Sequence, residues 1–157
     1  MPGFRCIAMA TETADRFRHT GVDDRGGTVH RRVVNGSGFP CRHCLRSGRL
    51  GEAMLLASYD LPLPRSVYWT PSPIFLHAET CPRYDAQNVI APIVRDNSLI
   101  SLRSYDAEGM CLYDLGHVGP GDAADAPLAS ALADPRTAYV NIHTARPGCL
   151  LCRVERT

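Results

Sequence analysis

Two Cys-x-x-Cys pairs are the residues of this chain whose type and spacing are best suited to chemistry. Cys41 and Cys44 form the first pair, and Cys149 and Cys152 form the second, more than one hundred residues later. Four thiolates at about 2.3 Å from a zinc ion complete the closed tetrahedral shell of a structural site. The four cysteines are therefore predicted to form a zinc site or a cluster of reduced thiols, although the pattern indicates no reaction.

The two pairs differ in how well they suit a shared metal. Cys41 and Cys44 follow a turn rich in Gly and Pro, and a tight turn folds both sulfurs to one side. Residues three apart in a regular strand point to opposite faces. Cys149 and Cys152 can therefore both bind only if Cys149 still lies in the preceding Pro-Gly turn, or if the strand carries a bulge.

His77 and Cys81 are the expected substitutes if one late cysteine fails to reach the site. They lie four residues apart and would share one face of a helical segment. Two other interpretations remain open. His77 can simply end a buried strand, and unpaired cysteines can pack as small apolar groups.

Thiol redox chemistry and thiol nucleophiles are the rival uses of these cysteines. A thioredoxin-type site needs its first thiol at the N-terminus of a helix, where the dipole lowers the thiol pKa. The residues after Cys44 are too few for a good helix before the next glycine. A nucleophilic Cys41 or Cys81 beside His77 or His143 is a further hypothesis, with no motif to fix its geometry.

A second candidate site is an anion pocket. The side chains of His143, Arg103 and Arg146 are predicted to bind a carboxylate or a phosphate, because guanidinium groups bind these anions with two parallel hydrogen bonds. An enzyme that acts on a small anionic substrate through a Cys/His/Arg pocket is therefore the alternative to a binding or structural protein. The simpler interpretation of the same residues is a solvated strand face.

Composition limits the possible functions. The 157 residues are predicted to form one domain, residues 1–157, with a net charge of +1 that favours neither nucleic acid nor an anionic membrane. All 17 cationic residues are arginine, which excludes a Schiff-base or P-loop lysine. No apolar run reaches the roughly 18 residues of a membrane span, and the N-terminus lacks a signal-peptide core. We therefore expect a cytoplasmic protein with reduced thiols, and the odd number of cysteines, seven, agrees with this.

The elements that must position these residues are short. The clearest prediction is a hairpin of residues 99–105 and 110–116 around an Asp-Ala-Glu-Gly turn. Two short helices are predicted at residues 12–19 and from 125 to just before Pro135. Other strands are predicted at residues 4–9, 28–34, 53–59, 74–77, 137–144 and 149–155. This order of elements predicts a compact α+β fold with a mainly antiparallel sheet.

The chain resembles a family of uncharacterised bacterial proteins, the domain of unknown function 1203 (DUF1203) family. The segments that carry the resemblance are Phe-Pro-Cys-Arg-His-Cys-Leu-Arg at 39–46, Pro-Ile-Phe-Leu at 73–76, Tyr-Asp-Ala at 105–107 and the stretch from Ala138 through Cys149 to Cys152-Arg153-Val154. The family carries no established activity. The resemblance therefore implies that the paired cysteines and Cys81 are family features, without implying a reaction.

Overall fold

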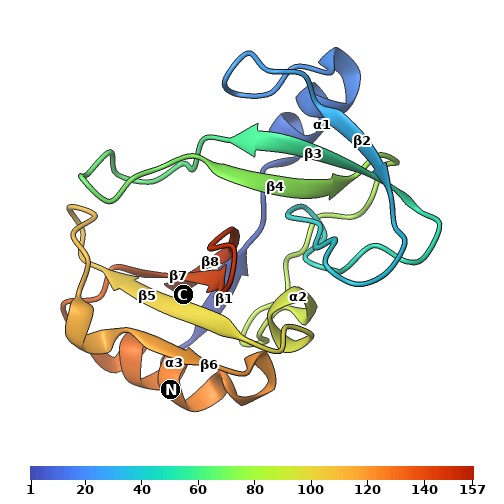
Figure 1. The fold of residues 1–157 in the computed structure, drawn as a ribbon. Helices are drawn as coiled ribbons and strands as arrows, with labels where there is room; N and C mark the ends of the chain where they lie inside the picture. Colours follow the sequence, from blue (N-terminus) through green and yellow to red (C-terminus); the bar gives the residue numbers. More distant parts are fainter.

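The structure is a computed structural model that describes residues 1–157. It contains two antiparallel sheets, which confirms the predicted α+β fold (Figure 1). The five-stranded sheet has the order β1-β8-β7-β5-β6, and its strands are β1 Phe4–Ile7, β5 Ile100–Tyr105, β6 His117–Gly119, β7 Tyr139–Thr144 and β8 Leu150–Arg156. The three-stranded sheet has the order β2-β3-β4, and its strands are β2 His30–Val33, β3 Ala53–Tyr59 and β4 Ser72–His77.

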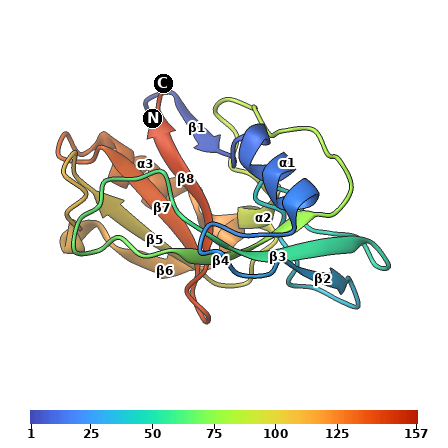
Figure 2. The same ribbon diagram turned by 90° about the horizontal axis from the view of Figure 1, so that it is seen from above.

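The helices cover the two sheets separately. The α-helices are α1 Thr11–Thr20, α2 Pro92–Arg95 and α3 Asp125–Ala133, and 3-10 turns lie at η1 Tyr113–Leu115 and η2 Gly121–Ala123. Figure 2 shows β1 leading from the five-stranded sheet into α1, which lies over the three-stranded sheet. α3 packs on β5 and β7. None of the helices combines the length and the apolar composition that a membrane crossing needs.

Each sheet has its own hydrophobic core. The larger core, of 19 buried residues, joins the five-stranded sheet to α2 and α3. The smaller core, of 13 buried residues, joins the three-stranded sheet to α1 and includes Cys41 and Cys44. Leu45, the next residue along, belongs to the larger core. The segment 41–45 therefore contacts both cores and lies where they meet.

The predicted hairpin is only half right. Its turn forms as expected, because Asp106 accepts hydrogen bonds from the amides of Glu108 and Met110, and Gly109 adopts a φ of 80°. The second predicted strand, residues 110–116, is wrong. That segment makes one isolated bridge, between Tyr105 and Cys111, and then turns into η1. The partner of β5 on this edge is the shorter β6.

Candidate metal centre

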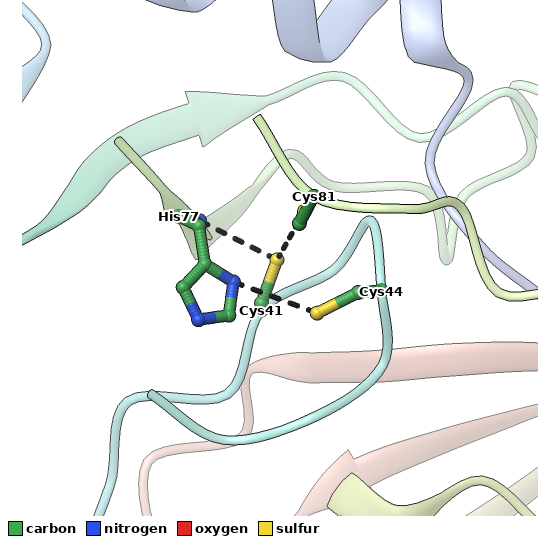
Figure 3. A group of neighbouring side chains, drawn as sticks. All are labelled: Cys41, Cys44, His77 and Cys81. Atoms are coloured by element: carbon green, nitrogen blue, oxygen red, sulfur yellow. Dashed lines mark hydrogen bonds between the residues drawn. The ribbon is translucent and has the colours of Figure 1, made fainter. Parts of the chain in front are cut away.

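Three sulfurs and one imidazole nitrogen lie together beside the three-stranded sheet (Figure 3). The ligand atoms of Cys41, Cys44, His77 and Cys81 all lie within 4.8 Å of one another. Cys41 Sγ is 3.9 Å from Cys81 Sγ, and Cys44 Sγ is 3.5 Å from His77 Nδ1. A tetrahedral shell with metal–sulfur bonds of 2.3 Å has edges of about 3.8 Å. The spacing of the four atoms therefore fits a single four-coordinate ion.

The first pair of ligands belongs to a tight turn. The amide of Cys41 donates to the carbonyl of Arg46 at 2.9 Å, which closes the loop around the pair. The amide of Cys44 donates to the Cys41 sulfur, and the amide of Arg46 donates to the Cys44 sulfur. Leu45 has a φ of 52°, which costs a non-glycine residue of order 1 kcal/mol or more and is here imposed by its complete burial. The turn thus points both sulfurs and two amide donors at one place.

The other two ligands come from the end of β4. His77 is the last residue of the strand, and Cys81 lies in the loop that follows. His77 presents Nδ1 to the sulfurs, and its Nε2 lies 3.2 Å from Oε2 of Glu52, the residue just before β3. A carboxylate on the far nitrogen fixes the tautomer and the ring plane of a metal-binding histidine. The imidazole is therefore oriented for binding through Nδ1.

Further donors point at the sulfurs from α1 and from the turn. Arg18 donates from Nη2 to Cys81 Sγ at 3.4 Å and from Nε to the carbonyl of His77 at 3.1 Å. His43 Nδ1 lies 3.2 Å from Cys81 Sγ, and its Nε2 lies 2.9 Å from the Thr11 hydroxyl. Burial lowers the pKa of His43, so the ring is neutral at pH 7 and can donate from Nδ1 to a thiolate. Arg18 and His43 thus both contact the Cys81 sulfur.

The titration of the group reflects the same contacts. Hydrogen bonds with the side chains of Cys44 and Cys81 lower the pKa of Cys41, and the contact with Cys41 raises the pKa of Cys44. Hydrogen bonds with Cys41 and Cys81 raise the pKa of His77 to about 10. Without a metal, these contacts favour the thiolate form of Cys41, with protons on Cys44 and His77. A metal ion would displace those protons when it binds.

The structure brings together only half of the ligand set predicted from the two Cys-x-x-Cys pairs. Cys41 and Cys44 are in the group, but Cys149 and Cys152 are outside it, and the two expected substitutes complete it. Cys152 is buried in the larger core, where its free thiol makes a hydrogen bond with the free thiol of Cys6. Cys149 lies half-buried in the turn before β8. The late pair therefore diverges, as expected for residues three apart at a strand.

The predicted anion-binding residues are also divided. Arg103 and His143 line a small cavity of about 40 Å³, which has room for a few water molecules. Arg146 lines a different, larger cavity together with Arg42 and Cys149. His143 Nδ1 donates to the carbonyl of Gly148 at 2.9 Å, and its Nε2 is buried without a partner. The three residues thus do not share one pocket.

Two residues that contact the site, Glu52 and Arg18, could not be predicted from the sequence. Neither Glu52 nor Arg18 has a spacing from the cysteines that indicates a role at a metal site, and they reach the site because β3 and α1 pack beside β4. His43 carried a weak signal, since it lies between the first two cysteines. Residues of this kind are found from contacts across the fold rather than from spacing along the chain.

Comparison with known proteins gives one match. The model of a family described as "Protein of unknown function (DUF1203)" matches residues 38–156. A search of curated proteins and a search of solved structures found no match. The matched range contains all four residues of the Cys/His group and both Cys-x-x-Cys pairs.

Proposed function

The chain belongs to the DUF1203 family of proteins of unknown function, and we propose that it is a binding or structural domain held together by one zinc ion. The ligands are Cys41, Cys44, His77 and Cys81. The observation that carries this proposal is the distance among the four ligand atoms, all within 4.8 Å. Three thiolates and an imidazole are a usual ligand set for structural zinc. The site needs reduced cysteines, which fits a cytoplasmic protein.

The role of the ion is structural because protein ligands fill all four positions. A catalytic zinc keeps one position open for water or substrate. Cys41 is fully buried and Cys44 is 6% exposed, so solvent does not reach the site from their side. The zinc would therefore stabilise the fold rather than activate a substrate.

The position of the turn explains what the ion would stabilise. The backbone of Arg42 bonds to Phe75 of β4 and to Met9, which links β1 and α1, and the carbonyl of Leu45 accepts from Ile93 of α2. The guanidinium of Arg42 donates from Nε to the carbonyl of Leu150 at 2.6 Å. One turn therefore connects the two sheets, and an ion that fixes its shape would fix their junction.

A thiol nucleophile is the second candidate function, and one contact favours it. His43 lies 3.2 Å from Cys81 and is itself held by the hydroxyl of Thr11. A thiol, a base and a group that orients the base are the parts of a nucleophilic site. The two candidates exclude each other at Cys81, because a sulfur bound to zinc is not free to attack a substrate.

Metal analysis of protein purified without a polyhistidine tag tests the proposal. We expect about one zinc per chain, with Cys81 protected from iodoacetamide until a strong chelator is added. We also expect the chelator to lower the melting temperature, because a ligand that binds only the folded state stabilises it. Zinc far below one per chain, with all seven thiols titrating, would exclude the metal site. Rapid alkylation of Cys81 in that protein would favour the nucleophile.

The ion pair of His77 with Glu52 gives a second prediction. We expect Glu52→Gln to lower the zinc affinity about tenfold, because loss of a carboxylate partner of a metal-bound histidine costs 10- to 100-fold. We expect the lower end of this range because the side chain of Glu52 is 41% exposed. Competition with a chromophoric chelator measures the affinity. Glu79→Gln is the matched control, since Glu79 lies in the exposed loop between His77 and Cys81, and equal losses in both variants would contradict the prediction.

A further inference from the structure

A cavity of about 490 Å³ is lined by Arg42 of the turn and by none of the four proposed zinc ligands. Its walls are the end of β1, the start of α1, the loop after β3 and the first half of β8. Ten of its eighteen lining residues are hydrophobic, among them Met9, Leu61 and Leu151. Small-molecule sites in proteins typically have volumes of about 300–1,000 Å³ with mostly apolar walls. The size and lining of this cavity suit a small organic ligand.

Three arginines that line the cavity are held in place by main-chain carbonyls. Arg42 donates to the carbonyls of Leu150 and Pro40. Arg83 donates to those of Ala8 at 2.9 Å and Met9 at 3.1 Å, and Arg153 donates to that of Pro62 at 3.1 Å. Each guanidinium retains one terminal nitrogen without a protein acceptor: Nη2 of Arg42, Nη1 of Arg83 and Nη2 of Arg153. The three groups are thus fixed before any ligand arrives, which reduces the entropy cost of binding.

The positive charge of the cavity is not balanced by its own carboxylates. Two acids line it, but Asp24 pairs with Arg16, and Asp60 pairs with Arg25 and Arg65. Arg153 pairs with Glu155, which does not line the cavity. Arg42 and Arg83 contact no carboxylate at all.

The burial of Arg42 makes this imbalance informative. Its residue is only 4% exposed, and although negative charge on the neighbouring Cys41 offsets part of its own charge, no carboxylate pairs with it. Arg83 is exposed and can contact an anion that enters from solvent. Guanidinium groups bind carboxylate and phosphate oxygens in a bidentate geometry. An anion in the cavity that both arginines line would add negative charge that no carboxylate supplies to them.

We propose that this cavity binds a small organic anion, with its carboxylate or phosphate head on Arg42 and Arg83 and its apolar body against the hydrophobic wall. This inference does not depend on the zinc site, because none of the four proposed zinc ligands lines the cavity. It differs from the anion pocket predicted from the sequence, since Arg103, His143 and Arg146 all lie elsewhere.

Calorimetric titration of the purified protein with hexanoate, hexyl phosphate and 1-hexanol at low ionic strength tests the proposal. At least one of the two anions should bind at least tenfold more tightly than the neutral alcohol, and the better of the two identifies the head group. Equal affinity for 1-hexanol, or binding of neither anion, overturns the proposal. This comparison uses only the unaltered protein, so it does not depend on whether a variant folds.

A variant of Arg83 then tests where the head group of the anion binds. Arg83→Gln should weaken binding of the better anion at least tenfold, whereas Arg31→Gln should leave it unchanged. Arg31 is the matched control because it is exposed on β2 and does not line the cavity. Circular dichroism confirms that each variant is folded. Folded Arg83→Gln protein with unchanged affinity overturns the assignment of the head group to this arginine.

Discussion

Cys81→Ala protein is expected to be purified with less than a tenth of the zinc found in the unaltered protein, whereas Cys149→Ala protein should retain about one zinc per chain. The physical reason is that Cys81 is one of four atoms within 4.8 Å of one another, and Cys149 is outside this group. A three-ligand site binds zinc more weakly by about a hundredfold or more, since four bonds together supply roughly 10–16 kcal/mol. Zinc content by mass spectrometry and affinity by chelator competition measure the difference.

The choice of cysteines makes this comparison well matched. Cys81 and Cys149 are both half-buried, so the two truncations remove similar amounts of packing. Cys152 would be a poor control because it is fully packed in the larger core, and its truncation would leave a cavity there. Loss of zinc from Cys149→Ala protein, with zinc retained by Cys81→Ala protein, would contradict the ligand set and restore the second Cys-x-x-Cys pair as ligands.

The first half of the candidate site could be predicted because its geometry is local. Cys41 and Cys44 are three residues apart in a turn, and a turn alone brings their sulfurs together. The second half depends on tertiary structure. β3 and β4 pair antiparallel, with Met54 opposite His77, and this register brings the strand end that carries His77 to Glu52 and to the turn. Spacing along the chain contains no information about that register. The sequence therefore favoured the second Cys-x-x-Cys pair, Cys149 and Cys152, as the remaining ligands.

A bulge in β8 explains why Cys149 and Cys152 do not lie together. The register shifts between Ile142 and His143, so Cys152 lies opposite Ile142 and Leu150 lies opposite His143. The shift directs Leu150 into the smaller core and leaves Cys152 in the larger one. A bulge was one of the two ways in which both late cysteines could have reached a shared metal. In the structure the bulge instead lets one strand contribute to both cores.

The hairpin shows the same division between local and distant causes. The turn at residues 106–109 depends on the side chain of Asp106 and could be predicted. The strand after it stops at η1, where the hydroxyl of Tyr113 contacts that of Tyr68 at 2.6 Å and Asp114 pairs with Arg136 at 2.7 Å. Both partners are more than twenty residues away. The alternating pattern of residues 110–116 contains no information about these two contacts.

The stability of the protein should fall by about 3 kcal/mol between pH 7 and pH 4 because of His143 alone. Burial, followed by the charge of Arg103, lowers the pKa of His143 from 6.5 to about 4. A depressed histidine pKa means that the unfolded chain binds the proton first, so unfolding becomes more favourable as the pH falls. The stabilisation is complete above pH 6.5 and is lost progressively towards pH 4, at about 1.4 kcal/mol per pKa unit.

Replacement of His143 by asparagine isolates this contribution. The asparagine amide can take over the hydrogen bond that Nδ1 donates to Gly148, while no group remains that titrates in this range. We expect the unfolding free energy in urea, measured from pH 7.5 to 4, to decrease less for His143→Asn by about 3 kcal/mol in total. His117→Asn on the exposed β6 should follow the unaltered protein. Zinc loss in acid affects all three proteins alike, so only the difference between their curves reports on His143. Parallel curves for the unaltered protein and His143→Asn would show that the burial of His143 does not control the acid sensitivity.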